Sequence, residues 1–419
     1  MRVAGTVQVP GDKSISHRAL LLAALADGPS RIRNILPSAD VHSTAGALRA
    51  LGVDVPALAP DMTIVGRGLG SLRASEADLD CGNSGTTTRL LSGIAAACPF
   101  ASRFTGDASL SRRPMQRVAR PLTAMGARIE FEGGDGLPMV ITGGSLHTIE
   151  WSTRTASAQT KSAILLAGLV AGVPVTVREP ARSRDHTERM LGAMGVGVTV
   201  RGTEVQLAPA PRLDPLDMTV PADPSSAAFL TALAVLAEQG ELTIPMVCLN
   251  ETRTGFFRAL ARMGARLELC LAAPQGGDVA GAVLARPSAL TGIELDPAEV
   301  PSMIDELPLL ACIAARAEGT TTISGAAELR VKESDRIAVT VANLRAVGIQ
   351  AEELPDGMRV MGSRRALRGA ICTHGDHRIA MAFGILAALP GNEIAIDDPG
   401  CVTVSYPDFW HDLRRVVAG

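Results

Sequence analysis

Two patterns of hydrophobic and polar positions recur along the chain, roughly 70 residues apart. In the first, a helix-like run with leucine-type residues three apart ends at a glycine, and an alternating strand follows, as in Leu48–Val55. Its glycines are Gly52, Gly126, Gly195, Gly264, Gly348 and, in a degenerate copy that closes the chain, Gly419. Each stands where the end of a helix needs a residue in the left-handed conformation, so each copy predicts a helix, a turn and a strand.

In the second pattern, small or polar residues lead into a run rich in alanine and leucine. The runs are Ser14 to Ala26, Gly85 to Ala97, Ser157 to Ala171, Ser225 to Ala237, Asp305 to Ala317 and His377 to Leu389. Because they are apolar on nearly every side, they predict deeply buried helices that pack on one another or on sheets.

Together the patterns define six units of two helices and several strands, which we divide into two domains of three units. The predicted domains are 12–224 and a second one made of 1–11 with 225–419, with hinges near 11–12 and 221–225, where proline, glycine and aspartate gather. The sixth unit ends without a strand, so we expect the N-terminal strand Gly5 to Val9 to complete it. A solenoid is the alternative, although common solenoid repeats are only about 20–50 residues long.

Composition removes several classes of function. With 47% hydrophobic and 20% charged residues, the 419-residue chain is expected to build a large core rather than stay disordered. Aromatic residues make up 3% and the net charge is −3, which argues against nucleic-acid binding. The seven cysteines are scattered without a Cys-x-x-Cys, so we expect buried, reduced thiols. No signal peptide or membrane span is predicted, and we expect a cytoplasmic protein.

Polar residues cluster at the starts of the buried helices. They are Lys13, Ser14, Arg18, Asn83, Ser84, Gly85, Thr86, Arg89, Ser157, Gln159, Lys161, Ser225, Ser226, Asp305, Glu306, Asp376, His377 and Arg378. Helix N-termini attract anions, and with arginine side chains they would form a site for phosphate or carboxylate groups. For the first helix, capped by Ser14 or Ser16, the alternative is a capped helix with two solvated cations.

Other motifs leave alternatives open. The loop Gly82–Thr86 lacks the spacing of a P-loop, which disfavours an ATPase. The charged stretch Arg330–Arg336 and the pair Asp305-Glu306 suit either a site or the solvated start of a helix. His374 and His377 lie three residues apart without further ligands, so no metal is expected.

Several motifs together resemble one family. They are Gly11–Arg18, Gly82–Thr86, Thr105–Asp107 with Arg112–Pro114, Ser157–Gln159, Arg330–Arg336 and Asp376–Arg378. In this order, over essentially the whole length, they resemble the 5-enolpyruvylshikimate-3-phosphate (EPSP) synthases. The resemblance implies an α/β fold, a two-domain inverted α/β barrel of six βαβαββ-type repeats with the active site in the interdomain cleft. It implies transfer of the enolpyruvyl group of phosphoenolpyruvate to the 5-hydroxyl of shikimate 3-phosphate, with no cofactor, no metal, and no nucleic-acid or membrane partner. We expect a monomer.

The resemblance also assigns residues. Those matching the shikimate 3-phosphate site are Lys13, Ser14, Arg18, Ser157, Ala158, Gln159, Arg184, Asp305 and Lys332. Those matching the phosphoenolpyruvate site are Lys13, Gly85, Arg113, Gln159, Arg336 and Arg378. Lys13, Asp305 and Glu333 match the catalytic acid and base groups, with Asp305 facing the 5-hydroxyl.

Two positions depart from the family pattern. Many members carry a lysine near the segment Tyr406–Asp408, where this chain has Val402 to Ser405, and some carry an asparagine where it has Glu328. The alternative is the sister transferase that acts on UDP-N-acetylglucosamine. That enzyme usually has Lys-Asn in place of Lys13-Ser14, and a reactive cysteine that the loop Ser109–Pro114 lacks. A non-catalytic repeat protein that binds anionic metabolites is a third interpretation, disfavoured by Asp305 and Glu333.

Overall fold

The chain divides into two compact units. The computed structural model describes residues 1–418. The N-unit comprises Gly11–Val220 and Pro274–Asp278; the C-unit comprises Met1–Pro10, Pro221–Ala273 and the chain from Val279 onward. The sequence assigned 274–278 to the C-terminal-type domain, and this was wrong. Asp278 belongs to the N-unit because its carboxylate accepts a hydrogen bond from the buried His186 side chain, with Nδ1 and Oδ2 2.8 Å apart.

All six predicted apolar helices form within the described residues. They are α1 (Lys13–Leu25), α3 (Gly85–Ala96), α5 (Ala158–Ala171), α7 (Pro224–Leu236), α9 (Leu307–Ala314) and α11 (His377–Ala387). Their residues are buried on nearly every side, as the sequence predicts. Only α9 is much shorter than its predicted run, Asp305 to Ala317. It starts at Leu307, with a proline in its first turn, so Asp305 and Glu306 lie in the turn before the helix.

The second helix of each of the six sequence repeats ends where the glycine pattern predicts. These helices are α2 (Ala39–Ala50), α4 (Gln116–Met125), α6 (His186–Ala193), α8 (Gly255–Arg262), α10 (Arg336–Ala346) and α12 (Phe409–Ala418). The glycines after the first five all have positive φ, from 84° at Gly52 to 117° at Gly126. The sixth, Gly419, lies outside the described residues.

The N-unit contains three small sheets. Two of them have the order β4-β5-β7-β6 and β8-β9-β11-β10, with a parallel first pair and antiparallel neighbours after it; the third has the order β12-β2-β3. The strands are β2 (Asp27–Arg33), β3 (Asp61–Arg67), β4 (Leu79–Asp80), β5 (Ala101–Thr105), β6 (Arg128–Phe131), β7 (Met139–Thr142), β8 (Ile149–Ser152), β9 (Val175–Arg178), β10 (Val198–Arg201), β11 (Glu204–Leu207) and β12 (Asp217–Thr219).

In the C-unit one sheet has the same plan, a second consists of three antiparallel strands, and the third is a single parallel pair. Their orders are β1-β13-β15-β14, β16-β18-β17 and β19-β20. The strands are β1 (Gly5–Thr6), β13 (Leu242–Cys248), β14 (Arg266–Leu271), β15 (Ala280–Arg286), β16 (Thr320–Ile323), β17 (Ala351–Leu354), β18 (Gly357–Met361), β19 (Arg368–Ile371) and β20 (Glu393–Ile396).

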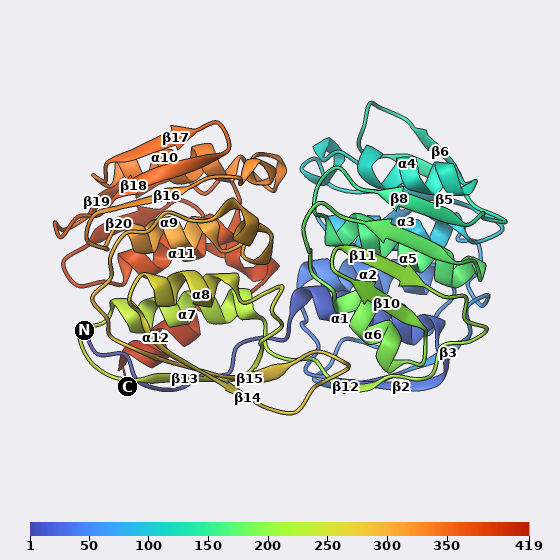
Figure 1. Ribbon diagram of the computed structural model, residues 1–419, viewed down its shortest axis with the longest axis horizontal. Helices are drawn as coiled ribbons and strands as arrows, with labels where there is room; N and C mark the ends of the chain where they lie inside the picture. Colours follow the sequence, from blue (N-terminus) through green and yellow to red (C-terminus); the bar gives the residue numbers. More distant parts are fainter. Residues whose placement is uncertain (419) are drawn as a thin grey trace. The chain divides into compact units, whose positions relative to one another are not determined.

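Two short strands are exchanged between the halves of the chain. β1, just before α1 in sequence, pairs in parallel with β13 of the C-unit, and β12, just before α7, pairs in parallel with β2 of the N-unit. The blue N-terminal segment accordingly runs along β13 (Figure 1). The expectation that the N-terminal strand completes the sixth repeat was wrong. β1 pairs with β13, the first long strand of the fourth repeat, because β12, which precedes that repeat in sequence, pairs with β2 instead.

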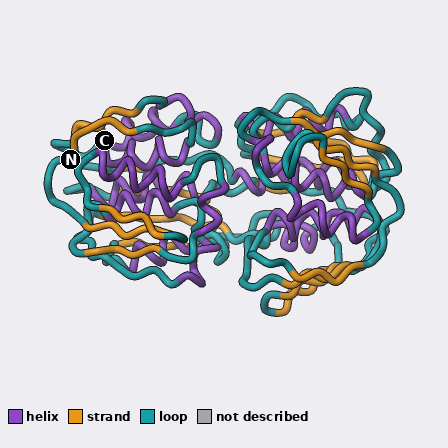
Figure 2. The backbone as a smooth tube through the Cα atoms, turned by 90° about the horizontal axis from the view of Figure 1, so that it is seen from above, coloured by secondary structure: helices purple, strands orange, loops and turns teal. Residues whose placement is uncertain are grey.

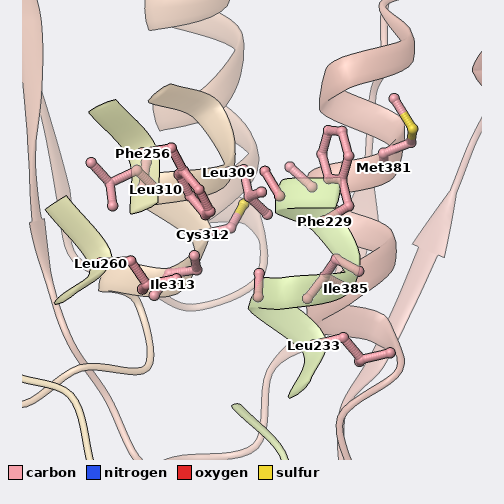
Figure 3. Close-up of a cluster of buried hydrophobic side chains, with 14 of the residues drawn as sticks. Phe229, Leu233, Phe256, Leu260, Leu309, Leu310, Cys312, Ile313, Met381 and Ile385 are labelled. Atoms are coloured by element: carbon pink, nitrogen blue, oxygen red, sulfur yellow. The ribbon is translucent and has the colours of Figure 1, made fainter. Parts of the chain in front are cut away.

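The helices lie in the interior of each unit and the strands lie outside them (Figure 2). Strand β3 alternates exposed and buried residues, because one face of its sheet covers helices and the other faces solvent. In the C-unit core, Phe229 and Leu233 of α7 lie near Ile385 of α11, and Leu260 of α8 lies near Ile313 of α9 (Figure 3). Among the described helices, none has the length and hydrophobicity that crossing a bilayer requires.

The cysteines follow the prediction only in part. Cys81, Cys98, Cys248 and Cys312 are buried, whereas Cys401 is half-buried and Cys270 and Cys372 are exposed. Burial raises the pKa of Cys98 to about 11 and that of Cys81 to about 12, so these two thiols stay protonated near neutral pH.

Candidate active site

The start of α1 gathers the first candidate residues. Asp12 caps the helix by accepting a hydrogen bond from the Ile15 N–H at 2.8 Å, so the predicted cap at Ser14 or Ser16 was wrong. The next side chain, Lys13, is 17% exposed and donates to Asp40 Oδ2 at 3.0 Å. Lys13 thus stands at the positive end of a helix dipole, with its ammonium group held but still accessible.

Arg18 lies one turn further along α1 and is buried. Its Nε donates to Thr187 Oγ1 at 2.7 Å, its Nη2 to Ser162 Oγ at 2.8 Å and its Nη1 to the Ser14 carbonyl at 2.8 Å. Burial lowers the pKa of Arg18 to about 10, with Glu188 the largest opposing influence, so it remains charged at neutral pH. Its cation therefore sits among neutral oxygens that join α1, α5 and α6.

The starts of α3 and α5 are joined through Gln159. Its Oε1 accepts from Arg89 Nη1 at 2.7 Å, and its Nε2 donates to Thr86 Oγ1 at 3.0 Å. Ser157 caps α5 by accepting from the Thr160 N–H at 3.4 Å, and Ala158 is the first residue of that helix. The predicted convergence of helix starts is thus present for these two helices.

Gly85 opens α3 in a crowded, cationic place. A methyl group added at its Cα would lie 2.8 Å from Arg89 Nη1 and 3.5 Å from Arg113 Nη1. Arg113 in turn donates to Asn83 Oδ1 at 2.6 Å. Glycine here lets two guanidinium groups approach the start of α3 closely.

Arg184 completes the candidate residues of the N-unit. Its Nη1 lies 3.5 Å from Ser14 Oγ, which links the loop before α6 to the start of α1. The N-unit therefore brings together Lys13, Ser14, Arg18, Gly85, Arg113, Ser157, Ala158, Gln159 and Arg184 around the starts of α1, α3 and α5.

In the C-unit, three cations converge on one carboxylate. Asp305 Oδ1 lies 3.2 Å from Arg336 Nη1 and 3.6 Å from Lys332 Nζ, and its Oδ2 lies 3.8 Å from Arg378 Nη2. Glu333 Oε2 lies 2.6 Å from Arg336 Nη2. The C-unit thus assembles its five candidate residues from three separate segments of the chain.

Two buried acids hold these cations in place. Asp376 accepts from Arg336 Nε at 2.8 Å and caps α11 by accepting from the Arg378 N–H at 3.0 Å. Burial alone would lower the pKa of Arg336, but Asp376 and the neighbouring carboxylates raise it overall. Burial raises the pKa of Asp376, but the charge and hydrogen bonds of Arg336, together with His377, lower it overall, so the pair is ionised. Glu306, which accepts from the Ser225 hydroxyl, lies 3.7 Å from Arg378 Nη1.

Sequence reasoning noted Arg89, Asp376 and Glu306 only as polar residues at helix starts. The signal that would have found Asp376 is its place as the cap of the helix that carries Arg378, because a capping carboxylate fixes that first turn. Nothing local in the sequence pairs Arg336 with Asp376, 40 residues apart.

The segment near Tyr406, where many family members carry a lysine, lies next to the core of the C-unit. Val402 to Val404 lie in a short 3-10 helix (Pro399–Val404), and the Tyr406 hydroxyl donates to Asp412 Oδ2 at 2.7 Å inside the core. Burial raises the pKa of Tyr406, so its hydroxyl stays protonated. Tyr406 therefore serves the packing of α12.

A model of the family described as EPSP synthase (3-phosphoshikimate 1-carboxyvinyltransferase) matches residues 1–413. The chain belongs to the EPSP synthase family. The resemblance drawn from the motifs is therefore confirmed, and so is an α/β fold of helices with several small sheets.

Relatives of this EPSP synthase family match over nearly their whole length. A 3-phosphoshikimate 1-carboxyvinyltransferase of Sulfurihydrogenibium sp. (strain YO3AOP1) is 47% identical, covering 99% of this chain and 97% of the relative. The protein of that name from Bacillus subtilis (strain 168) is 44% identical, covering 98% and 97%. A solved structure of EPSP synthase from Acinetobacter baumannii is 40% identical with a TM-score of 0.87, covering 99% and 96%. These matches favour EPSP synthase over the UDP-N-acetylglucosamine alternative.

Proposed function

We propose that this protein transfers the enolpyruvyl group of phosphoenolpyruvate to the 5-hydroxyl of shikimate 3-phosphate and releases phosphate. The observation that carries this proposal is the cluster on Asp305, where one acid faces Lys332, Arg336 and Arg378 within 3.8 Å. Cations bind the anionic substrates, and an acid among them supplies the proton transfer that this addition needs.

The chemistry assigns a role to each acid and base. Asp305 accepts the proton of the 5-hydroxyl as that oxygen attacks C2 of phosphoenolpyruvate, while C3 gains a proton. The tetrahedral ketal then loses a C3 proton, the double bond forms again, and the bond from C2 to the phosphate oxygen breaks. Lys13 and Glu333 serve as the donor and acceptor at C3. A positioned acid or base of this kind contributes about 10²–10⁴-fold.

The N-unit cluster is proposed to hold the shikimate 3-phosphate. Its phosphate suits Ser157 and Gln159 at the start of α5 together with Arg184, and Lys13, Ser14 and Arg18 face the same ligand. A helix N-terminus and an arginine fork both favour a phosphate dianion. Ala158 offers only its backbone there.

Phosphoenolpyruvate is proposed to bind Arg113, Arg336 and Arg378, with Lys13 and Gln159 shared between the two ligands. The close approach of two guanidinium groups to Gly85 supports this part of the proposal, because it concentrates positive charge at the start of α3, where a carboxylate or phosphate group can bind.

The finer architecture is part of the same proposal. We take the fold to be an inverted α/β barrel of six βαβαββ-type repeats, three per domain, in which both clusters serve one reaction. The repeated βαβαββ order of β4 to β7 and of β8 to β11 supports it. If both clusters act together, orientation and exclusion of water supply much of the rate, since effective molarities reach about 10⁵–10⁸ M.

The test is phosphate release from phosphoenolpyruvate in the presence of shikimate 3-phosphate, with the enolpyruvyl product identified by mass spectrometry. Turnover with this pair, and none with UDP-N-acetylglucosamine in its place, is the expected result. Turnover with the UDP-sugar alone would overturn the assignment. Binding of both metabolites without turnover would point to the non-catalytic interpretation.

A further inference from the structure

One buried carboxylate of the N-unit has no role in the proposed reaction, yet it contacts several parts of the proposed phosphate site. Glu179 follows β9 directly and is 6% exposed. Its Oε1 accepts from the Ser157 N–H at 3.0 Å, and its Oε2 lies 2.7 Å from Lys161 Nζ. The Ser183 hydroxyl donates to the same carboxylate, 2.6 Å from Oε1 and 2.9 Å from Oε2.

These contacts join two segments that are far apart in sequence. Ser157 is the cap of α5, so its backbone position decides where the first turn of that helix points. Ser183 is the residue before Arg184, whose guanidinium reaches Ser14 Oγ at 3.5 Å. A single carboxylate therefore fixes both the α5 start and the loop that carries Arg184.

Lys161 extends this connection to α6. Its ammonium lies 2.8 Å from Glu188 Oε1, and both side chains are 3% exposed. Burial alone would lower the pKa of Lys161, but Glu188 and Glu179 raise it overall, so the cation persists. Burying three charged groups is costly and adds little net stability even when they are paired, so geometric precision is a better reason for their presence.

We propose that Glu179 is a positioning residue for the phosphate of shikimate 3-phosphate, an inference that rests on the proposed function. It does not touch the substrate. It acts through the Ser157 backbone and through Ser183, which together set the distance between the α5 N-terminus and Arg184. Partners of this kind orient the groups that bind a ligand, and losing them weakens binding more than chemistry.

The test compares steady-state kinetics of wild type and Glu179→Gln with both substrates varied. The amide keeps one acceptor oxygen but presents an NH₂ group toward the donors of Ser157, Ser183 and Lys161. We expect the KM for shikimate 3-phosphate to rise about tenfold, with kcat and the KM for phosphoenolpyruvate changed less than about threefold. Calorimetric titration of shikimate 3-phosphate should show the same loss of affinity.

Two further variants separate positioning from general stability. Ser183→Ala removes only the hydroxyl link, should fold normally, and should raise the same KM about threefold. Glu150→Gln makes the same chemical change at an exposed residue of β8 that pairs with Arg178 of β9. This control should leave both KM values and kcat unchanged.

Each outcome bears on one claim. Wild-type turnover is the test of the proposed function, whereas the variants test Glu179. An unchanged shikimate 3-phosphate KM in folded Glu179→Gln, or in Ser183→Ala if the former does not fold, would overturn the inference. So would an equal rise in both KM values together with a lowered melting temperature, because that is the pattern of a merely structural residue.

Discussion

The two clusters of candidate residues hold their buried arginines Arg18 and Arg336 in opposite ways, although Lys13 of the N-unit is paired with the carboxylate of Asp40. In the N-unit, Arg18 donates to two hydroxyls and a carbonyl, and Arg113 donates to the Asn83 amide oxygen. In the C-unit, Arg336 contacts Asp305, Glu333 and Asp376. Neutral oxygens position a cation without cancelling its charge, whereas carboxylates position it and balance it.

The difference suggests a division of work. Cations held by neutral groups keep their attraction for an anion, which suits binding of the phosphate ester. A cluster that mixes acids and cations can bind an anion and also move protons, which suits the addition and elimination steps. The following experiments test this contrast, from the largest expected effect to the smallest.

Replacing Lys13 should have the largest effect, because it is proposed to contact both ligands and to exchange a proton. We expect Lys13→Met to lower kcat/KM by about 10⁴-fold, at the upper end for a single acid or base. Circular dichroism should show an unchanged fold. Arg33→Met, which removes a half-buried cation paired with the exposed Asp217, is the matched control. Activity near that of wild type would refute the assigned role.

Asp305→Asn probes the C-unit side of the comparison. The amide can still accept from Arg336 but cannot take the hydroxyl proton, so kcat should fall by about 10²–10³-fold while either KM changes little. Glu318→Gln, at an exposed carboxylate paired with Arg364, serves as the control. A change in KM without a change in kcat would make Asp305 a binding residue only.

Gly85→Ala tests whether phosphoenolpyruvate binds beside Arg89 and Arg113 at the start of α3. The added methyl must push Arg89 Nη1 away from 2.8 Å. We expect the KM for phosphoenolpyruvate and the inhibition constant of glyphosate, the family's phosphoenolpyruvate-competitive inhibitor, to rise about tenfold, or about 1.4 kcal/mol. Gly46→Ala, where a methyl meets nothing within 4 Å, is the control. An unchanged inhibition constant would count against this placement.

The smallest effect concerns His17, which lies in α1 between Lys13 and Arg18 in sequence. Burial, together with the cations Lys13 and Arg18, lowers its pKa to about 3 against the opposing influence of Asp40. The unfolded chain binds a proton near pH 6.5 and the folded protein does not, so stability falls as the pH drops from 6.5 toward 3. Between pH 6.5 and 5.5 this amounts to about 1 kcal/mol.

Urea unfolding of wild type and His17→Gln over this pH range measures that contribution. The variant should lose part of the pH slope, whereas His42→Gln, at an exposed position on α2, should keep it. Equal slopes in all three proteins would show that the pKa of His17 is the same in the folded and unfolded chain.

What the sequence could predict was local. The apolar helices and the left-handed glycines follow from neighbouring residues, because helix burial and C-terminal turns depend on spacing within a few residues. The motifs that resembled EPSP synthases also marked the candidate positions that the two units assemble into two clusters, except Arg184 and Asp305, which lie outside those motifs.

What it could not predict was pairing over long distances. The N-terminal strand could complete any unpaired sheet edge, and only packing selects β13. The membership of 274–278 depends on Asp278 meeting His186, 92 residues away. In the sequence, Glu179 is an acid after a strand with no special signal. Its contacts with Ser157 and Lys161 appear only in the folded structure.

The exchange of β1 and β12 sets an order of events on the ribosome. β1 is made first, but its partner residue Leu242 is made only after the whole segment 11–220 has emerged. Residues 274–278 of the N-unit appear later still, after β13 and β14. The N-unit therefore cannot be completed until part of the C-unit has been made. Severing the chain between Val220 and Pro221 would leave one fragment without residues 274–278 of its core and the other without β1 of its sheet.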